Sequence, residues 1–279
     1  MLKRVITGIC IIAVITPIII FSNTWAFPCA IAIISVFCMY ELARCMGMHK
    51  NIPMTVPLYI FAVAFPFLQR LPIFENDTSV ALIAVMAIIF YVAYLFGCVI
   101  FSKGKITYPD ICTIGFSSIY ILFALNMTIY IRDYNGYIAF LILIGSWVTD
   151  TMAYFTGRLF GKHKLSPDIS PKKTVEGSIG GTIGCAIAFV LFGLIVKAIS
   201  PEATPNYIYL AVSGLIIAVI SQAGDLIMSA MKRHYKIKDF GNILPGHGGM
   251  LDRVDSILSV TLGMEMLIVF TTLTNISLF

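Results

Sequence analysis

Charged residues are scarce in this chain. Asp, Glu, Lys and Arg make up 12% of its 279 residues, 59% of the residues are hydrophobic, and the mean hydropathy is +0.93. Soluble globular domains carry about 25% charged residues. The composition therefore excludes an ordinary soluble protein and predicts an all-α, polytopic integral membrane protein.

Several patterns that carry chemistry in other proteins are also absent. The seven cysteines are odd in number and scattered, and they have neither metal-ligand spacing nor the look of a disulfide framework. No Ser/His/Asp or Cys/His arrangement points to acyl transfer. A Walker A interpretation of Gly157–Lys162 fails because the glycines stand one residue too close and His163 replaces the required Ser or Thr.

Nine segments meet the requirement of about 20 mostly apolar residues for a membrane-spanning helix. They are residues 5–21, 27–45, 53–69, 78–101, 111–131, 136–156, 177–198, 207–230 and 255–277. Three prolines interrupt the third segment, which predicts a kinked or partly re-entrant helix. The first segment also resembles a signal peptide, but the many similar segments that follow favour its retention as a span.

The basic residues predict the orientation in the membrane. With the N-terminus in the cytosol and nine spans, all but three of the 19 Lys and Arg residues lie on the cytosolic side; the exceptions are Arg70, Arg132 and Lys197. The absence of a transit segment favours the cytoplasmic membrane of a bacterium. The net charge of +5 sits beside apolar runs, which favours lipid headgroups and phosphates over nucleic acid as partners.

The most polar stretch runs from Gly224 to Ser256, across the end of one apolar segment, a loop and the start of the next segment. One predicted helix face carries residues at steps of three and four: Ser221, Asp225, Ser229, Lys232 and Lys236. Helix capping and anchoring at the cytosolic face would explain single residues here. They do not explain a carboxylate within an apolar segment, or the glycines of the loop, which let backbone N–H groups approach a ligand.

A second polar stretch runs from Asp150 to Gly184. Asp150, Tyr154 and Arg158 share one helix face at the inner end of the sixth span. An ionisable residue at membrane depth is a functional hypothesis by default, with a structural ion pair to Arg158 as the alternative. Paired lysines, hydroxyls and a predicted helix start near 175–178 follow, and such groups suit a triphosphate. These lysines could instead only anchor the loop at the cytosolic face.

The first polar stretch contains, in this order, Ser229, Lys232–Arg233, Lys238–Asp239, His247–Gly248–Gly249 and Asp252–Arg253–Val254–Asp255. This order resembles the signature of the phosphatidate cytidylyltransferase (CDP-diacylglycerol synthase) family. The second, Ser170–Gly181, is similar to the SPKKTxEGSxGG stretch of the family. The specific resemblance covers residues 145–279, whereas the N-terminal half matches only in being hydrophobic.

The resemblance implies that CTP and phosphatidate react to give CDP-diacylglycerol and pyrophosphate, with Mg²⁺ as cofactor, alone or with a second cation. Carboxylates beside lysines suit such metal-assisted phosphoryl chemistry. We expect metal ligands at Asp150, Asp225, Asp252 and Asp255. The other expected catalytic residues are Lys232, Arg233 and His247, and the expected binding residues are Ser170, Lys172, Lys173, Thr174, Ser229, Lys238, Gly248 and Gly249.

We expect residues 1–135 to form a transmembrane scaffold and residues 136–279 a catalytic region whose site faces the cytosol. Small-xxx-small glycine pairs make a homodimer plausible. Two other functions stay open: a CTP-dependent polyprenol or phytol kinase, which resembles this family in its C-terminal region, and a membrane transporter with intramembrane carboxylates. The complete run from Lys232 to Asp255 favours the cytidylyltransferase. No partner is predicted for Glu265.

Overall fold

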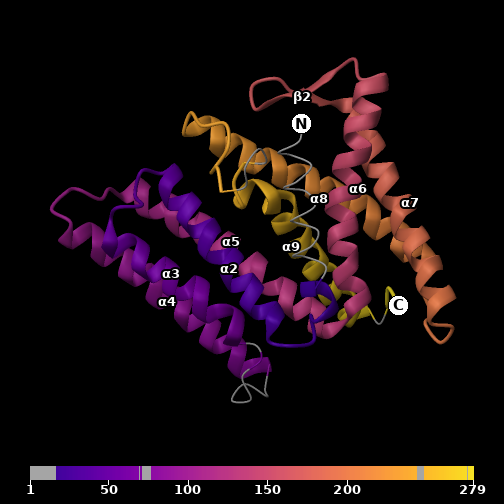
Figure 1. Ribbon diagram of the computed structural model, residues 1–279, viewed down its shortest axis with the longest axis horizontal. Helices are drawn as coiled ribbons and strands as arrows, with labels where there is room; N and C mark the ends of the chain where they lie inside the picture. The colour runs from indigo at the N-terminus through magenta and orange to yellow at the C-terminus, as the bar shows by residue number, and fades with distance from the viewer. Residues whose placement is uncertain (1–16, 69, 71–76, 244–247, 275) are drawn as a thin grey trace. The chain divides into compact units, whose positions relative to one another are not determined.

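A computed structural model of the protein describes residues 17–68, 70, 77–243, 248–274 and 276–279 (Figure 1). The described residues form helices joined by short connections and one small β-hairpin. The helices are α2 (Ala26–Cys45), α3 (Ile52–Leu68), α4 (Asp77–Phe101), α5 (Tyr108–Tyr134), α6 (Gly136–Phe160), α7 (Val175–Ile199), α8 (Tyr207–His234) and α9 (Leu251–Thr274). Each of them overlaps one predicted span, and most of the first predicted span, 5–21, lies outside the described residues.

Six of the described helices are long and apolar enough to cross a membrane: α2, α5, α6, α7, α8 and α9. Two shorter apolar helical segments are also present: α3 (Ile52–Leu68) and the Val85–Phe101 part of α4. The protein is thus an integral membrane protein built from α-helices. The third predicted span is a continuous helix, α3, that runs through Pro57 and Pro66.

The chain forms two compact units. The first contains Met1–Tyr130 and Ile237–Arg253, and the second contains Ile131–Lys236 and Val254–Phe279. The described residues 237–243 and 248–253, which carry part of the predicted signature, therefore belong to the same unit as the N-terminal helices. The proposed division of roles, scaffold before 135 and catalysis after it, stays a prediction.

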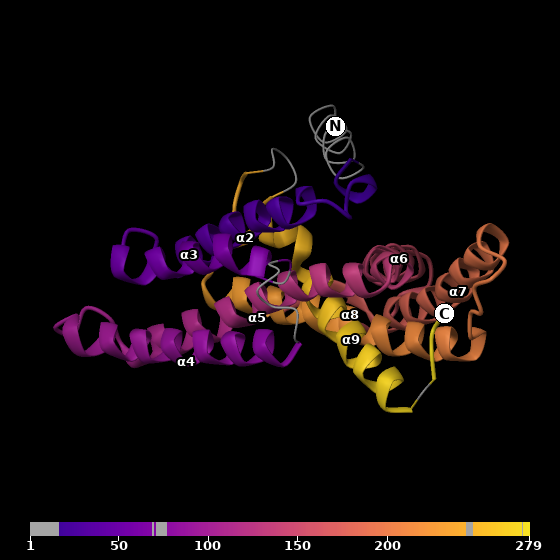
Figure 2. The ribbon, with the colours of Figure 1, turned by 90° about the horizontal axis from the view of Figure 1, so that it is seen from below.

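In the first unit α2 and α3 pack side by side, and α4 packs against α3 (Figure 2). α2 and α3 bury apolar side chains completely or nearly so, including Met39, Leu42, Met54, Leu58 and Ala62. Many apolar side chains of α4 are exposed in this single chain, as expected for a helix that faces lipid.

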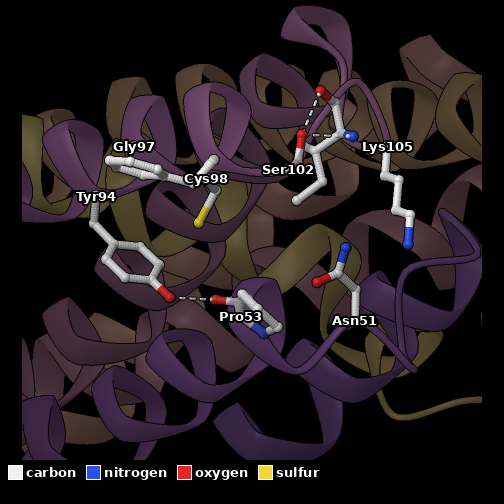
Figure 3. A pocket seen from close by; sticks show the side chains of 9 residues that line it. Asn51, Pro53, Tyr94, Gly97, Cys98, Ser102 and Lys105 are labelled. Carbon is white, nitrogen blue, oxygen red and sulfur yellow. Dashed lines mark hydrogen bonds between the residues drawn. The ribbon is translucent and has the colours of Figure 1, made fainter.

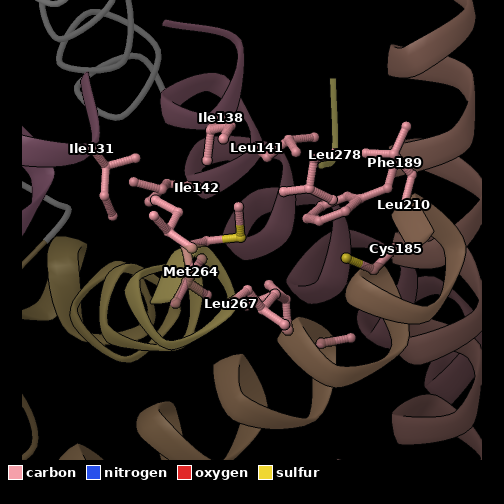
Figure 4. Close-up of a cluster of buried hydrophobic side chains, with 14 residues drawn as sticks. Ile131, Ile138, Leu141, Ile142, Cys185, Phe189, Leu210, Met264, Leu267 and Leu278 are labelled. Atoms are coloured by element: carbon pink, nitrogen blue, oxygen red, sulfur yellow. The ribbon is translucent and has the colours of Figure 1, made fainter. Parts of the chain in front are cut away.

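In the second unit α6 lies alongside α7, and α7 packs on α8 (Figure 1). The approach of α6 and α7 is close because α7 presents glycines: a Cβ added at Gly177 would lie 2.7 Å from the Ala153 carbonyl oxygen, and one at Gly181 would lie 2.8 Å from that of Thr149. The apolar core of the unit, with Phe189 fully buried, draws side chains from all four helices α6 to α9 (Figure 4). Gly177 and Gly181, which are spaced as a small-xxx-small pair, therefore pack α7 against α6 within the chain.

The connection between α6 and α7 contains a hairpin that the sequence interpretation did not predict. Strands β1 (Lys164–Ser166) and β2 (Ser170–Thr174) pair antiparallel. The start of the hairpin is fixed by Glu176, whose carboxylate accepts hydrogen bonds from the backbone N–H groups of Lys162 and His163 and contacts the His163 ring. The two predicted binding lysines, Lys172 and Lys173, therefore stand on a strand and not in an irregular loop.

The helices around the first polar stretch extend further than predicted. α8 continues to His234, with Lys232, Arg233 and His234 in its last turn, where positive charge favours the helix C-terminus. α9 begins at Leu251, so Asp252 lies in its first turn. Lys236 lies beyond the end of α8 and has a positive φ of 55°, so it does not continue the polar face predicted for that helix.

Candidate active site

The second unit gathers carboxylates and ammonium groups from several helices. Asp225 on α8 forms an ion pair with Lys173, which stands on β2. Asp255 on α9 lies 3.9 Å, Oδ2 to Nζ, from Lys232 on α8. The side chains of Lys232 and Asp255 are only 11% and 12% exposed, so both charges of this pair are removed from bulk solvent and need each other.

The predicted polar face of α8 is the buried face of this helix. Ser221, Ser229 and Lys232 are all buried, and the Ser229 hydroxyl donates to Asp225 Oδ1 over 3.5 Å. α8 meets α9 closely at Gly224, where an added Cβ would lie 1.8 Å from the Ser259 hydroxyl oxygen. The glycine therefore allows the helix that carries Asp225 to pack directly on the helix that carries Asp255.

Asp150 joins this group through a hydroxyl network. The Ser256 hydroxyl donates to Asp150 Oδ2 over 3.4 Å and also lies 2.8 Å from the Ser146 hydroxyl oxygen. Asp150 interacts electrostatically with Asp225, and Asp255 interacts with both. Among the described residues Asp150 and Arg158 form no ion pair, so that alternative prediction is not observed. Arg158 Nη1 instead donates a hydrogen bond to the Tyr154 hydroxyl at 3.2 Å.

The remaining predicted residues of this unit lie on the hairpin or beside it. Lys172 is exposed on β2 and has no ion pair with any described residue, and Ser170 begins the same strand. The Arg233 Nε–H donates to the Ile169 carbonyl oxygen over 3.2 Å, which ties the hairpin turn to the end of α8. The buried Thr174 hydroxyl accepts a hydrogen bond from the Gly177 N–H at 3.1 Å, so it caps the N-terminus of α7.

The first unit holds the rest of the signature. Asp252 Oδ2 accepts hydrogen bonds from the backbone N–H groups of Phe240 at 2.8 Å and Gly249 at 3.0 Å, and so closes the loop before α9. Gly248 has a φ of 87°, a conformation that L side chains rarely adopt. Lys238 is exposed, and His247 lies outside the described residues.

One residue of this loop's surroundings was missed in the sequence. Glu41, at the end of α2, is 0% exposed, and its two carboxylate oxygens accept hydrogen bonds from the N–H groups of Met250 (3.0 Å) and Leu251 (2.8 Å). A carboxylate inside an apolar span is a signal that could have identified it. The sequence prediction names Asp150 and not Glu41, because Glu41 lies outside the two polar stretches.

A cavity in the first unit does not coincide with any of these groups. Its volume is about 480 Å³, and its walls include Pro53, Tyr94, Cys98 and Lys105 (Figure 3). None of the predicted site residues lines it. The carboxylate groups on α6, α8 and α9 therefore remain the best candidates for the chemistry.

The residues fit a hard divalent cation by donor type but do not form a protein cage for one. Within the described ranges no three acidic, His or Cys side chains are arranged to hold a metal ion together. Mg²⁺ usually takes one or two carboxylates and completes its shell with water and substrate phosphate oxygens. The paired arrangement of Asp225 and Asp255 with lysines is compatible with this mode of binding.

Comparison with known proteins gives the chain its family. The sequence profile of the cytidylyltransferase family matches residues 2–271. The chain is 34% identical over 268 residues to the phosphatidate cytidylyltransferase of Bacillus subtilis, covering 93% of this chain and 94% of that protein. It is 34% identical over 270 residues to the enzyme of the same name from Staphylococcus haemolyticus, covering 95% and 98%, and 35% identical over 204 residues to that of Thermotoga maritima, covering 72% and 73%. The chain thus belongs to the cytidylyltransferase family and is a nucleotidyltransferase enzyme.

Proposed function

We propose that this protein is a phosphatidate cytidylyltransferase, which makes CDP-diacylglycerol and pyrophosphate from CTP and phosphatidate. The observation that carries the proposal is the pairing of Asp225 with Lys173 and of Asp255 with Lys232. Relatives that carry this enzyme name match the chain over nearly its whole length, which supports the same substrates here.

In the proposed reaction a phosphate oxygen of phosphatidate attacks the α-phosphorus of CTP in line. A new P–O bond forms as the bond from that phosphorus to the oxygen bridging to the β-phosphate breaks, and pyrophosphate leaves. Both substrates are anions, so the protein's main task is to bring them together and to stabilise the charge of the transition state. Lys173 and Lys232 are suited to this task because each ammonium group is already held in place by a carboxylate.

Mg²⁺, alone or with a second cation, would be held by Asp225 and Asp255, with Asp150 and Asp252 as further proposed ligands. When bound, the cation supplies charge neutralisation between the two phosphates. Lys172 on β2 and Arg233 would contact the triphosphate, with Ser170, Ser229 and Lys238 as further binding groups. Gly248 and Gly249 would allow close backbone approach, and His247 would donate to a phosphate oxygen or to the leaving pyrophosphate.

The proposed setting is the cytoplasmic membrane, with nine spans, a cytosolic N-terminus, and a homodimer as the assembled form. Labelling with a membrane-impermeant maleimide in intact cells tests this topology in a chain without its native cysteines. A cysteine introduced as Glu202→Cys should be labelled from outside, and one introduced as Asp168→Cys should not. The opposite result would reverse the proposed orientation.

The reaction itself is tested by pyrophosphate release from purified protein in mixed micelles with Mg²⁺. We expect release that requires both CTP and phosphatidate, and CDP-diacylglycerol in equal amount. CDP formed from CTP and a polyprenol would indicate a lipid kinase instead. Absence of turnover with phosphatidate would refute the proposed lipid substrate.

A further inference from the structure

Glu41 stands far from the signature in the sequence and next to it in the first unit. It lies 209 residues before Met250 and 210 before Leu251, and it accepts hydrogen bonds from the backbone N–H groups of both. These two N–H groups lie at the start of α9 and have no partner within that helix. One fully buried carboxylate on α2 therefore satisfies two donors at the start of the helix that carries Asp252.

The fit around Glu41 is tight on two sides. A Cβ added at Gly249 would lie 2.5 Å from both Glu41 carboxylate oxygens, and one added at Gly241 would lie 2.1 Å from Glu41 Oε1. Both glycines thus leave room for this carboxylate. The loop that Asp252 closes through Phe240 and Gly249 is therefore built against Glu41 as well.

The charge of Glu41 suits its place. A carboxylate at a helix N-terminus interacts favourably with the partial positive charge of the free N–H groups, and a buried one needs such donors. An amide in its place could accept from one N–H group but would turn its own NH₂ toward the other. An isosteric Gln therefore keeps the size of the side chain and removes half of its function.

We propose that Glu41 is a positioning residue for the reaction, resting on the proposed function above. It fixes the first turn of α9, and with it the direction of the Asp252 side chain, without touching a substrate. Residues that orient metal ligands affect metal affinity or activity by about 10- to 100-fold when they are changed. The N-terminal helices would then do more than provide a scaffold, because one of them holds the signature in its active form.

The test is a Mg²⁺ titration of CTP- and phosphatidate-dependent pyrophosphate release. We expect Glu41→Gln to raise the Mg²⁺ concentration needed for half-maximal activity, or to lower kcat, by about 10- to 100-fold with little change in KM for CTP. The matched control is Glu265→Gln, which changes a partly buried carboxylate on a different span; its Oε2 has no hydrogen-bond partner among the described residues. Glu265→Gln should leave the Mg²⁺ dependence unchanged.

Gly241→Ala provides a second arm that leaves Glu41 in the chain. Its methyl group should push the carboxylate off the two N–H groups and produce the same Mg²⁺ phenotype. In a Glu41→Ala background the same methyl group has space, so Gly241→Ala should add little there, and the two effects should be strongly non-additive. Additive effects would show that Gly241 acts by another route and would overturn the proposal.

The outcomes separate the two levels of the proposal. Absence of CTP- and phosphatidate-dependent turnover by the unchanged protein would refute the proposed function. If the unchanged protein turns over and Glu41→Gln has the same kcat and Mg²⁺ dependence, only the positioning role fails. If Glu41→Gln loses thermal stability in detergent but its folded fraction has normal Mg²⁺ dependence, Glu41 is only structural, and the proposal is equally overturned.

Discussion

The two units satisfy their buried and partly buried acids in different ways. In the second unit Asp225 and Asp255 face the side-chain ammonium groups of Lys173 and Lys232. In the first unit Glu41 and Asp252 each accept hydrogen bonds from two backbone N–H groups. A lysine can turn toward a phosphate or make way for a cation, whereas a backbone amide moves only if its helix or loop moves. The first arrangement is suited to binding charged substrates, and the second is suited to holding a shape.

The contrast between the two units would fail if Asp225 and Asp255 could be neutralised without loss of activity. We expect Asp225→Asn and Asp255→Asn each to lower kcat/KM by at least about 10³-fold, because each removes an ion pair with a lysine and a proposed metal ligand. Pyrophosphate release measures the effect. Asp168→Asn, on the exposed hairpin turn, serves as the control and should keep normal activity. Activity within tenfold of the unchanged protein would exclude the metal role.

Asp252 could belong to either group of acids: those that bind charged ligands or those that hold the loop in shape. An Asn can keep its side-chain oxygen toward the Phe240 and Gly249 N–H groups, whereas an Ala cannot. If Asp252 is also a metal ligand, as we propose, both Asp252→Asn and Asp252→Ala should lower kcat by about 10²-fold or more. Near-normal activity of Asp252→Asn beside an inactive Asp252→Ala would place Asp252 with Glu41 as a residue that only holds the loop.

Lys172 tests whether the lysines of the second unit bind the CTP substrate. Its exposed ammonium group has no ion pair among the described residues, so it is available for the triphosphate. Lys172→Ala should raise KM for CTP by about 10-fold, the effect of losing one charged hydrogen bond, and leave KM for phosphatidate nearly unchanged. Lys164→Ala, on the other strand of the hairpin, is the matched control. An effect confined to phosphatidate would assign the strand to the lipid instead.

The smallest expected effect concerns Thr174, a predicted binding residue that caps α7. Thr174→Ala should lower the free energy of unfolding by about 1 kcal/mol, whereas Thr174→Ser should keep both the cap and the stability. Thermal unfolding in detergent compares the two. A KM for CTP that rises in Thr174→Ala and not in Thr174→Ser, with equal stability of both, would show that the hydroxyl binds substrate and contributes little as a cap.

The helices were predictable because a membrane span needs a long apolar run, and α6, α7 and α8 begin close to the predicted residues. Their ends were less predictable. α8 runs past its apolar part to His234 because basic residues favour a helix C-terminus, and α9 starts at Leu251, where Glu41 satisfies its first N–H groups. The β1–β2 hairpin was missed because its short strands contain Pro171 and paired lysines, which read as a loop.

For the candidate site, periodicity correctly placed Asp225, Ser229 and Lys232 on one face of α8. It could not show that Lys173 would reach Asp225, or that Ser256 would link Asp150 to Ser146, because those contacts depend on how the helices pack. The role of Glu41 was even harder to predict from the sequence. Its partners are two backbone groups more than 200 residues away, and backbone groups leave no pattern in the sequence.

The separation between Glu41 and its partners also concerns the order in which the chain is made. At roughly 5 to 20 residues per second, the ribosome needs roughly 10 to 40 seconds to make the 209 residues that lead from Glu41 to Met250. During that time α2 enters the membrane with an acid whose donors do not yet exist. A new chain therefore carries this acid without its two N–H donors until α9 is made, and a chain that stops before α9 lacks those donors altogether.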